Sequence, residues 1–192
     1  PIGRANIDNL GRYADTFEVT PNRKVRALLN RIGLEQVGDI SWPEHATIFT
    51  TPWRVAAAMG IKLVLYGENP NEAYGGPEGT DQAKDMSPAW VAEFGGFLGL
   101  RASDMIGVRG LTREDLQPYQ PLEWPKVREQ GIRALFMGSF FEWDSERNAR
   151  VAREHGMLQH KPCPANWWEA ENLDNAMTGL HDHAMYRKYG YG

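Results

Sequence analysis

A short apolar run constrains the fold more than any other feature of the chain. The run "IKLVLY" occupies residues 61–66, stands between Gly60 and Gly67, and contains a single charged residue. A strand without a polar face is typical of a parallel sheet that is covered on both sides. We therefore expect residues 61–66 to form a strand of this kind.

Two helices are predicted before this strand. A Thr-Pro pair at residues 20–21 supplies the cap and first position of the first helix, whose apolar residues recur at helical spacing. We expect Gly33 to end this helix, because glycine is a common C-terminal stop. The second helix is predicted to begin near Pro43, to bend at Pro52 and to stop at Gly60.

Strands are also predicted at residues 13–19 and 132–141. Asp144 or Ser145 follows the second of them as the cap of another helix, and Thr112 has an acid three residues later, as in a capping box. A last helix, capped by Asp174, makes the C-terminal part helical. Helices that alternate with apolar strands predict a doubly wound α/β fold with a mainly parallel sheet and right-handed crossovers.

Composition limits the classes of function. The 192 residues carry a formal net charge of −4, which argues against nucleic-acid binding through phosphate neutralisation. Cys163 is the only cysteine, so we expect no internal disulfide, no multi-cysteine zinc site and a reducing, cytoplasmic location. The sequence has no run of about 18 apolar residues, so a membrane span is not expected.

Polar residues follow the apolar run directly, in the phrase "GENPNEAYGG" at residues 67–76. In open parallel sheets, ligands gather beyond the carboxyl ends of the strands. Glu68 can accept hydrogen bonds from sugar hydroxyls, hold Mg²⁺ or act as a base, and Asn69 can both donate and accept. Gly75 and Gly76 let the backbone approach a ligand closely. The alternative interpretation is a polar turn that caps the next segment.

Other polar and aromatic groups are better explained by structural roles. Asp144 is more readily a helix cap than part of a site. His181 and His183 stand two residues apart on a predicted helix, where they do not share a face, so no metal site is expected from them. Trp167 and Trp168 are typical loop anchors, although they could instead stack on a sugar ring.

Three longer phrases together resemble one enzyme family. They are "WPEHATIFTTPWRVAAAMGIKLVLYGENPNEAYGG", "GSFFEWDSERNARVAREHG" and "ENLDNAMTGLHDHAMYRKYGYG", and the likeness extends over nearly the whole chain. In this order they resemble the N-acetyl sugar amidotransferases of the PP-loop ATP pyrophosphatase superfamily, which act in bacterial surface-polysaccharide and flagellin-sugar biosynthesis. The resemblance implies an α/β fold of the PP-loop, adenine-nucleotide α-hydrolase type.

The resemblance also implies a reaction. Members of the family convert the acetamido group of a nucleotide-linked sugar into an acetamidino group, using ATP and ammonia that a glutaminase partner supplies. An amide oxygen is a poor leaving group, and its adenylation with loss of pyrophosphate turns it into a departing AMP that ammonia can displace. We expect ATP to bind at glycine-rich backbone amides and helix N-termini, in a site that excludes water.

Residues at the matching positions are the candidates for this site. The resemblance implies Glu68 and Asn69 as catalytic residues, and His45 would lie near the nucleotide. Lys188 could meet a sugar carboxylate or diphosphate. The positions expected to bind the substrate are Tyr74, Gly75, Gly76, Glu171, Asn172, Asp174, Thr178, His181, Asp182, Lys188 and Tyr189.

The superfamily's nucleotide signature, SGGxDS, does not occur in the sequence. We expect it to precede Pro1 together with the first strand, so that residues 1–76 are a partial PP-loop core truncated at its N-terminus. Residues 77–192 would continue the α/β domain and add a helical substrate-binding segment. ATP and Mg²⁺ would then bind to the full-length parent, whereas the isolated chain would bind ATP weakly or not at all and be inactive. A homodimer could cover the sheet edge that a missing strand exposes.

Two other interpretations stay open. A different PP-loop enzyme, such as a tRNA-thiolating or NAD-synthetase-like protein, would carry cysteine pairs or a basic RNA-binding face, and neither is visible. A non-catalytic remnant that binds a partner or a nucleotide-sugar would lack the phosphate loop. The residues that precede Pro1 would discriminate between the enzyme and the remnant.

Overall fold

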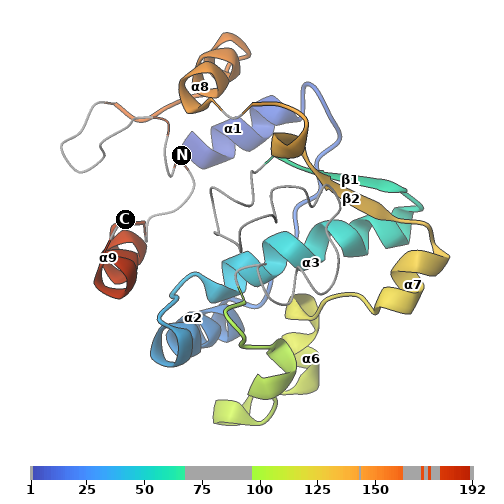
Figure 1. The fold of residues 1–192 in the computed structure, drawn as a ribbon, viewed down its shortest axis with the longest axis vertical. Helices are drawn as coiled ribbons and strands as arrows, with labels where there is room; N and C mark the ends of the chain where they lie inside the picture. Colours follow the sequence, from blue (N-terminus) through green and yellow to red (C-terminus); the bar gives the residue numbers. More distant parts are fainter. Residues whose placement is uncertain are drawn as a thin grey trace. The chain divides into compact units, whose positions relative to one another are not determined.

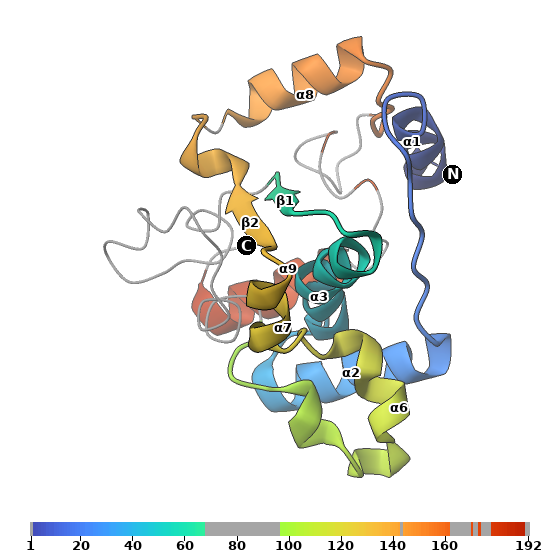
Figure 2. The ribbon, with the colours of Figure 1, turned by 90° about the vertical axis from the view of Figure 1, so that its right-hand side faces the viewer.

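A computed structural model describes residues 2–67, 97–142, 144–161, 170, 173 and 178–190. The chain forms two compact units. The central unit consists of residues 20–142, and the terminal unit joins residues 1–19 to residues 143–192. Figures 1 and 2 show the helices and strands of each unit.

The first helix of the central unit is α2 (Arg23–Val37). Its cap is Asn22, whose side-chain oxygen accepts hydrogen bonds from two amides of the first turn. The helix ends at Gly38, which adopts the left-handed conformation with a φ of 69°. The cap predicted at residues 20–21 and the end predicted at Gly33 are therefore wrong, because the helix starts later and continues through Gly33.

The second predicted helix is confirmed as α3 (Trp42–Met59), which stops at Gly60 with a φ of 70°. Pro52 lies inside the helix. Proline has no amide hydrogen, so the carbonyl of residue 48, four positions earlier, is left without its usual helical donor. α3 packs on α2 and contributes several buried side chains to the core of the unit.

Two strands, β1 (Leu63–Tyr66) and β2 (Arg133–Phe136), form a parallel pair beside α3. Their last residues are paired in register, so both strands end at the same edge of the sheet. The strand predicted at residues 132–141 is shorter than expected, because the 3-10 turn η5 (Met137–Ser139) follows β2 directly. Helices combined with a parallel pair of strands agree with an α/β fold.

The two faces of β1 differ in burial. Val64 and Tyr66 are buried, whereas Leu63 and Leu65 are 49% and 54% exposed. Alternate side chains of a strand point to opposite sides of the sheet, and α3 packs on one side of this one. The prediction that this strand is covered on both faces is therefore wrong.

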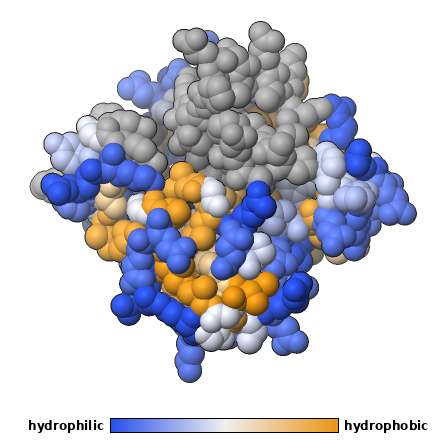
Figure 3. Space-filling model, turned by 60° about the horizontal axis from the view of Figure 1, so that its bottom comes forward, coloured by the Kyte–Doolittle hydropathy of each residue, from blue (hydrophilic) through white to orange (hydrophobic). Residues whose placement is uncertain are grey.

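Among the described residues, the central unit also has five short helical segments: η2 (Ala102–Met105), η3 (Val108–Gly110), α6 (Arg113–Leu116), η4 (Gln117–Tyr119) and α7 (Trp124–Glu129). The capping box predicted at Thr112 is confirmed, since its hydroxyl accepts from the Asp115 amide and the Asp115 carboxylate accepts from the Thr112 amide. The Thr50 hydroxyl of α3 donates a hydrogen bond to the Pro118 carbonyl of η4 at 2.9 Å and so joins η4 to α3. Figure 3, which brings the side of α6 forward, shows hydrophobic residues among hydrophilic ones.

The terminal unit contains α1 (Ile2–Leu10), α8 (Ser145–Glu154) and α9 (Thr178–Tyr189). Asp144 caps α8 as predicted, because its Oδ1 accepts a hydrogen bond from the Arg147 amide at 2.9 Å. The backbone of Leu158, which follows α8, binds Asn6 of α1 in both directions. Asn6 Nδ2 donates to the Leu158 carbonyl at 3.0 Å, and Asn6 Oδ1 accepts from the Leu158 amide at 2.8 Å.

The strand predicted at residues 13–19 does not form. The Tyr13 amide instead donates to the Leu10 carbonyl at 2.9 Å, in a turn that continues from α1. The Tyr13 hydroxyl donates to the backbone carbonyl of His155 at 3.2 Å. Phe17 and Val19 are 59% and 55% exposed, so the apolar alternation in this segment does not mark a buried face.

None of the described helices combines the length and the apolar character that crossing a membrane requires.

Candidate functional site

The carboxyl ends of β1 and β2 form one edge of the sheet, which we call the strand-end edge. It consists of the last residue of each strand, Tyr66 and Phe136, together with Gly67 after β1 and the turn Met137–Ser139 after β2. Glu68 and Asn69 follow Gly67 directly in the sequence. Loops and helix starts that converge beyond such an edge are the usual ligand site of α/β proteins.

α3 is attached to the strand-end edge through the last residue of β1. The Tyr66 hydroxyl donates a hydrogen bond to the Ile48 carbonyl at 3.3 Å, and the rings of Tyr66 and Phe49 stack with their centroids 5.7 Å apart. The Ile48 carbonyl is the one that Pro52 leaves without a helical donor. The N-terminal half of α3 therefore lies at the carboxyl end of β1.

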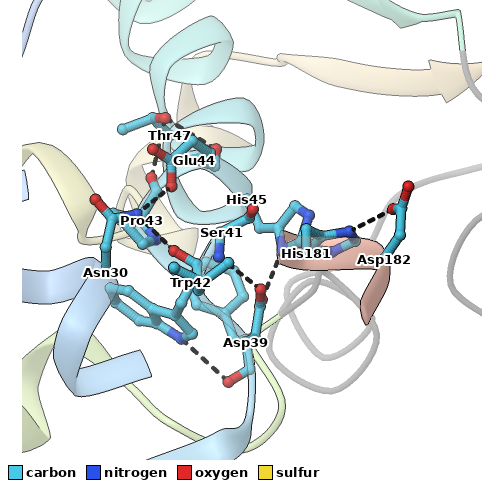
Figure 4. A network of polar contacts seen from close by, with 12 residues as sticks. Asn30, Asp39, Ser41, Trp42, Pro43, Glu44, His45, Thr47, His181 and Asp182 are labelled. Carbon is cyan, nitrogen blue, oxygen red and sulfur yellow. Dashed lines mark hydrogen bonds and ion pairs between the residues drawn. The ribbon is translucent and has the colours of Figure 1, made fainter. Parts of the chain in front are cut away.

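A buried carboxylate holds a histidine at the start of α3, as Figure 4 shows. Asp39 is 3% exposed; its Oδ1 accepts from the Ser41 amide at 2.7 Å and its Oδ2 accepts from His45 Nδ1 at 2.8 Å. The His45 side chain is 21% exposed. His45 precedes Ile48 by three residues, which is about 4.5 Å along a helix axis. The Asp39–His45 pair is thus close to the strand-end edge.

Side chains of α2 hold the same first turn of α3. Asn30 Nδ2 donates to the Ile40 carbonyl at 2.5 Å and to Glu44 Oε2 at 2.8 Å, and Arg26 Nε donates to Glu44 Oε1 at 2.6 Å. A carboxylate in the first turn is also favourable toward the positive end of the helix dipole. The start of α3 is therefore anchored by these polar contacts, whereas the side chain of its cap residue, Ser41, makes no capping hydrogen bond.

Gly33 lets the turn between the two helices approach α2 closely. A Cβ atom at Gly33 would lie 2.5 Å from the backbone oxygen of Asp39 and 2.7 Å from the Cβ of Trp42. The Asp39 amide in turn donates to the Gly33 carbonyl at 3.2 Å. The absence of a side chain at Gly33 is therefore a condition for the position of Asp39.

Of the residues predicted from the sequence, His45 lies in the central unit, in the first turn of α3. Thr178, His181, Asp182, Lys188 and Tyr189 lie in α9 of the terminal unit. The remaining predictions fall outside the described residues; they are Glu68, Asn69, Tyr74, Gly75, Gly76, Glu171, Asn172 and Asp174. The boundary proposed after residue 76 also falls outside them.

The predicted positions in α9 recur at helical spacing. Thr178 and His181 are three residues apart, and Lys188 follows His181 after seven residues, which is about two turns, so these positions share one side of the helix. His181 Nδ1 contacts Asp182 Oδ1 at 3.2 Å. His183 lies in the same helix two residues from His181, and no three His, Cys, Asp or Glu side chains of the described residues are grouped so that they could hold a metal ion.

Sequence reasoning missed Asp39. The signal that could have found it is the phrase "GDISWPEHA" at residues 38–46, in which an acid precedes the cap residue of a helix by two positions and a histidine by six. An aspartate in that place can accept the amide of the residue two positions later, and its second oxygen then points toward the first turn.

Comparison with known protein families and with curated proteins finds no match to the chain.

Proposed function

We propose that this chain is part of an ATP-dependent amidotransferase that converts the acetamido group of a nucleotide-linked sugar into an acetamidino group. The proposed setting is surface-polysaccharide biosynthesis in the cytoplasm, with ammonia delivered by a glutaminase partner. The proposed fold is a doubly wound PP-loop sheet, of which β1 and β2 would be two neighbouring strands.

The observation that carries the proposal is the strand-end edge. Two parallel strands end there side by side, and the first is followed at once by the phrase "GENPNEAYGG", which is the most specific part of the family resemblance. The buried Asp39–His45 pair lies close to the same edge. Polar groups that gather beyond parallel strands support a ligand site rather than an ordinary turn.

The roles proposed for the residues follow from the chemistry. Glu68 and Asn69 would contact the reacting amide or the phosphates, and His45 would lie beside the nucleotide. The polar positions of α9 would bind the sugar, with Lys188 able to meet a negative group of the nucleotide-sugar. Mg²⁺ would accompany ATP as its usual partner.

The decisive experiment uses the protein encoded by the complete gene, together with its glutaminase, ATP, Mg²⁺ and a set of nucleotide-linked N-acetyl sugars. We expect mass spectrometry to detect exchange of the acetamido oxygen for an NH group, with one AMP and one pyrophosphate released for each product. Glu68→Gln should abolish the product and leave the circular dichroism spectrum unchanged. Glu129→Gln, which changes an exposed glutamate of α7, is the matched control and should retain full turnover.

Two results would decide against this function. Turnover by Glu68→Gln at the wild-type rate would remove Glu68 from the site. Absence of any amidine product, with nucleotide-sugar binding still measurable by calorimetry, would favour a non-catalytic binding module. A calorimetric titration of the isolated chain should show weak or no ATP binding, and micromolar affinity would contradict this expectation.

A further inference from the structure

An exposed phenyl ring follows the strand-end edge on the side of β2. Phe141 is 65% exposed, and no other large hydrophobic residue in the described part of the chain is more exposed. Single exposed apolar residues are common on protein surfaces, so exposure alone does not identify a site. The position of Phe141 in the fold is the second observation.

The backbone holds Phe141 within one turn of the strand-end edge. β2 ends at Phe136, and the turn η5 begins with the next residue, Met137. The amides of Phe140 and Phe141 both donate to the Met137 carbonyl, at 2.9 and 3.0 Å. A bond between residues four apart closes one helical turn, so Phe141 stays near the end of β2.

Packing explains the other aromatic rings of this edge but not that of Phe141. Tyr66 and Phe136, the last residues of the two strands, are both buried, and their ring centroids are 5.7 Å apart. These two rings belong to the hydrophobic core of the central unit. Phe141 follows them in the sequence and keeps most of its surface in water, so its ring is accessible to a ligand.

The ligands of the proposed reaction include planar rings, because ATP and a nucleotide-linked sugar each carry a nucleobase. A phenyl ring has no group that could bind phosphate or a sugar hydroxyl, but its flat face can stack on any nucleobase. The next residue, Glu142, is exposed. Its carboxylate repels phosphate groups at close range, which favours the base end of a nucleotide beside Phe141.

We propose that Phe141 binds a nucleobase of the substrates by stacking, with the phosphates directed away from Glu142. The inference rests on the proposed function and names the part of the ligand that this end of the site binds. Stacking on an aromatic side chain strengthens binding roughly 5- to 100-fold relative to alanine. The competing explanation is a second copy of the chain that covers the ring, and it predicts no dependence on the base.

The test measures binding by calorimetry in the protein from the complete gene, without turnover. The probes are the nucleotide-linked N-acetyl sugar, ATP with Mg²⁺, and the N-acetyl sugar 1-phosphate, which lacks a base. We expect Phe141→Ala to weaken the binding of one nucleotide roughly 5- to 100-fold and to leave the sugar 1-phosphate unaffected. The nucleotide whose affinity falls carries the base that stacks.

Three further variants separate stacking from other effects. Phe141→Tyr keeps an aromatic face and should bind within a few-fold of the wild type. Phe141→Leu keeps an apolar side chain without a ring and should lose affinity as Phe141→Ala does. Phe17→Ala is the matched control, because Phe17 is 59% exposed and belongs to the terminal unit, and it should bind both nucleotides as the wild type does.

Wild-type affinity of Phe141→Ala or of Phe141→Leu for both nucleotides would overturn the inference. So would a lower oligomeric mass of Phe141→Ala in analytical ultracentrifugation together with unchanged nucleotide affinity, which would assign the ring to a contact between copies. In these cases amidine formation by the wild type would leave the proposed function intact. A wild-type protein that binds neither nucleotide would refute the proposed function, and the inference would fall with it.

Discussion

At the scale of single residues, the position of Asp39 depends on a residue that has no side chain. Gly33 lies within α2, where glycine lowers helix stability relative to alanine by up to about 1 kcal/mol. The contacts computed for a Cβ at this position, 2.5 Å from the Asp39 oxygen and 2.7 Å from the Trp42 Cβ, explain why a better helix former is absent. Close packing of the following turn outweighs local helix propensity here.

We therefore predict that Gly33→Ala destabilises the central unit by about 1–3 kcal/mol, because backbone atoms must move to admit the methyl group. Urea unfolding followed by tryptophan fluorescence measures the change. Gly179→Ala is the control, since a Cβ at Gly179 has no atom within 4 Å and should leave stability nearly unchanged or slightly higher. Equal stability of Gly33→Ala and the wild type would contradict the close packing of Asp39 and Trp42 against Gly33.

A second residue, Tyr119, has an unusual environment for a phenol. It is 1% exposed, and no described residue lies within hydrogen-bonding distance of its hydroxyl. Burial raises the pKa of Tyr119 to about 12, with a further contribution from the neighbouring Glu44 carboxylate that Arg26 opposes. The folded protein therefore keeps this phenol neutral at a pH at which the unfolded chain already ionises it.

The direction of the pH effect follows from that difference. An ordinary tyrosine ionises near pH 10, so the contribution of Tyr119 to stability is complete below pH 10 and is lost as the pH rises toward 12. We predict that Tyr119→Phe is as stable as the wild type or more so at pH 7. Between pH 7 and pH 11 the free energy of unfolding of the wild type should fall by on the order of 1 kcal/mol more than that of the variant. Parallel stability curves for the two proteins between pH 9 and pH 11 would contradict this.

At the scale of elements, Pro52 and Tyr66 link α3 to β1. Pro52 removes the amide that would bond to the Ile48 carbonyl, and the Tyr66 hydroxyl supplies a donor at 3.3 Å instead. The stacked ring of Phe49 covers the same contact. The carbonyl that Pro52 leaves without a helical donor thus takes part in a tertiary contact between α3 and the last residue of β1.

A double-mutant cycle tests this link. Tyr66→Phe should lower the free energy of unfolding by about 0.5–1.5 kcal/mol in the wild-type background, because a partly buried carbonyl loses its donor. In a Pro52→Ala background the same change should cost less, since the new amide at position 52 reaches the Ile48 carbonyl. Equal costs in both backgrounds would show that the two residues act independently.

At the scale of the whole molecule, the two ends of the sequence belong to one unit. The side-chain amide of Asn6 makes two hydrogen bonds with the backbone of Leu158. It donates to the Leu158 carbonyl and accepts from the Leu158 amide. Asn9 Nδ2 adds a bond to the His155 carbonyl at 2.9 Å. These side chains of α1 hold the segment that ends α8, although the two segments are far apart in the sequence.

We predict that Asn6→Ala lowers the stability of the terminal unit by on the order of 1–2 kcal/mol, because two hydrogen bonds are lost at once. Hydrogen exchange measured by NMR should become faster at the Leu158 amide and in α8, while α3 keeps its protection. Asn9→Ala, which removes one exposed bond, should have a smaller effect. Equal acceleration of hydrogen exchange in α3 would contradict an effect that is confined to the terminal unit.

Local signals in the sequence determined the elements whose boundaries were predicted correctly. α3 ends at Gly60, Asp144 caps α8 and Thr112 begins a capping box, as expected. Each of these depends on a hydrogen bond or a backbone angle within about four residues, and residue type alone is informative over that distance. The apolar run at residues 61–66 likewise produced a parallel strand, β1.

Tertiary structure decided the features for which local signals were insufficient. Gly33 remains helical because the turn at Asp39 packs against it, and residues 13–19 form no strand because Tyr13 bonds to His155 instead of to a neighbouring strand. The Asp39–His45 pair also depends on that close packing. Such contacts join residues that are distant in the sequence, and their energies depend on shape and distance, so residue type and spacing do not contain them.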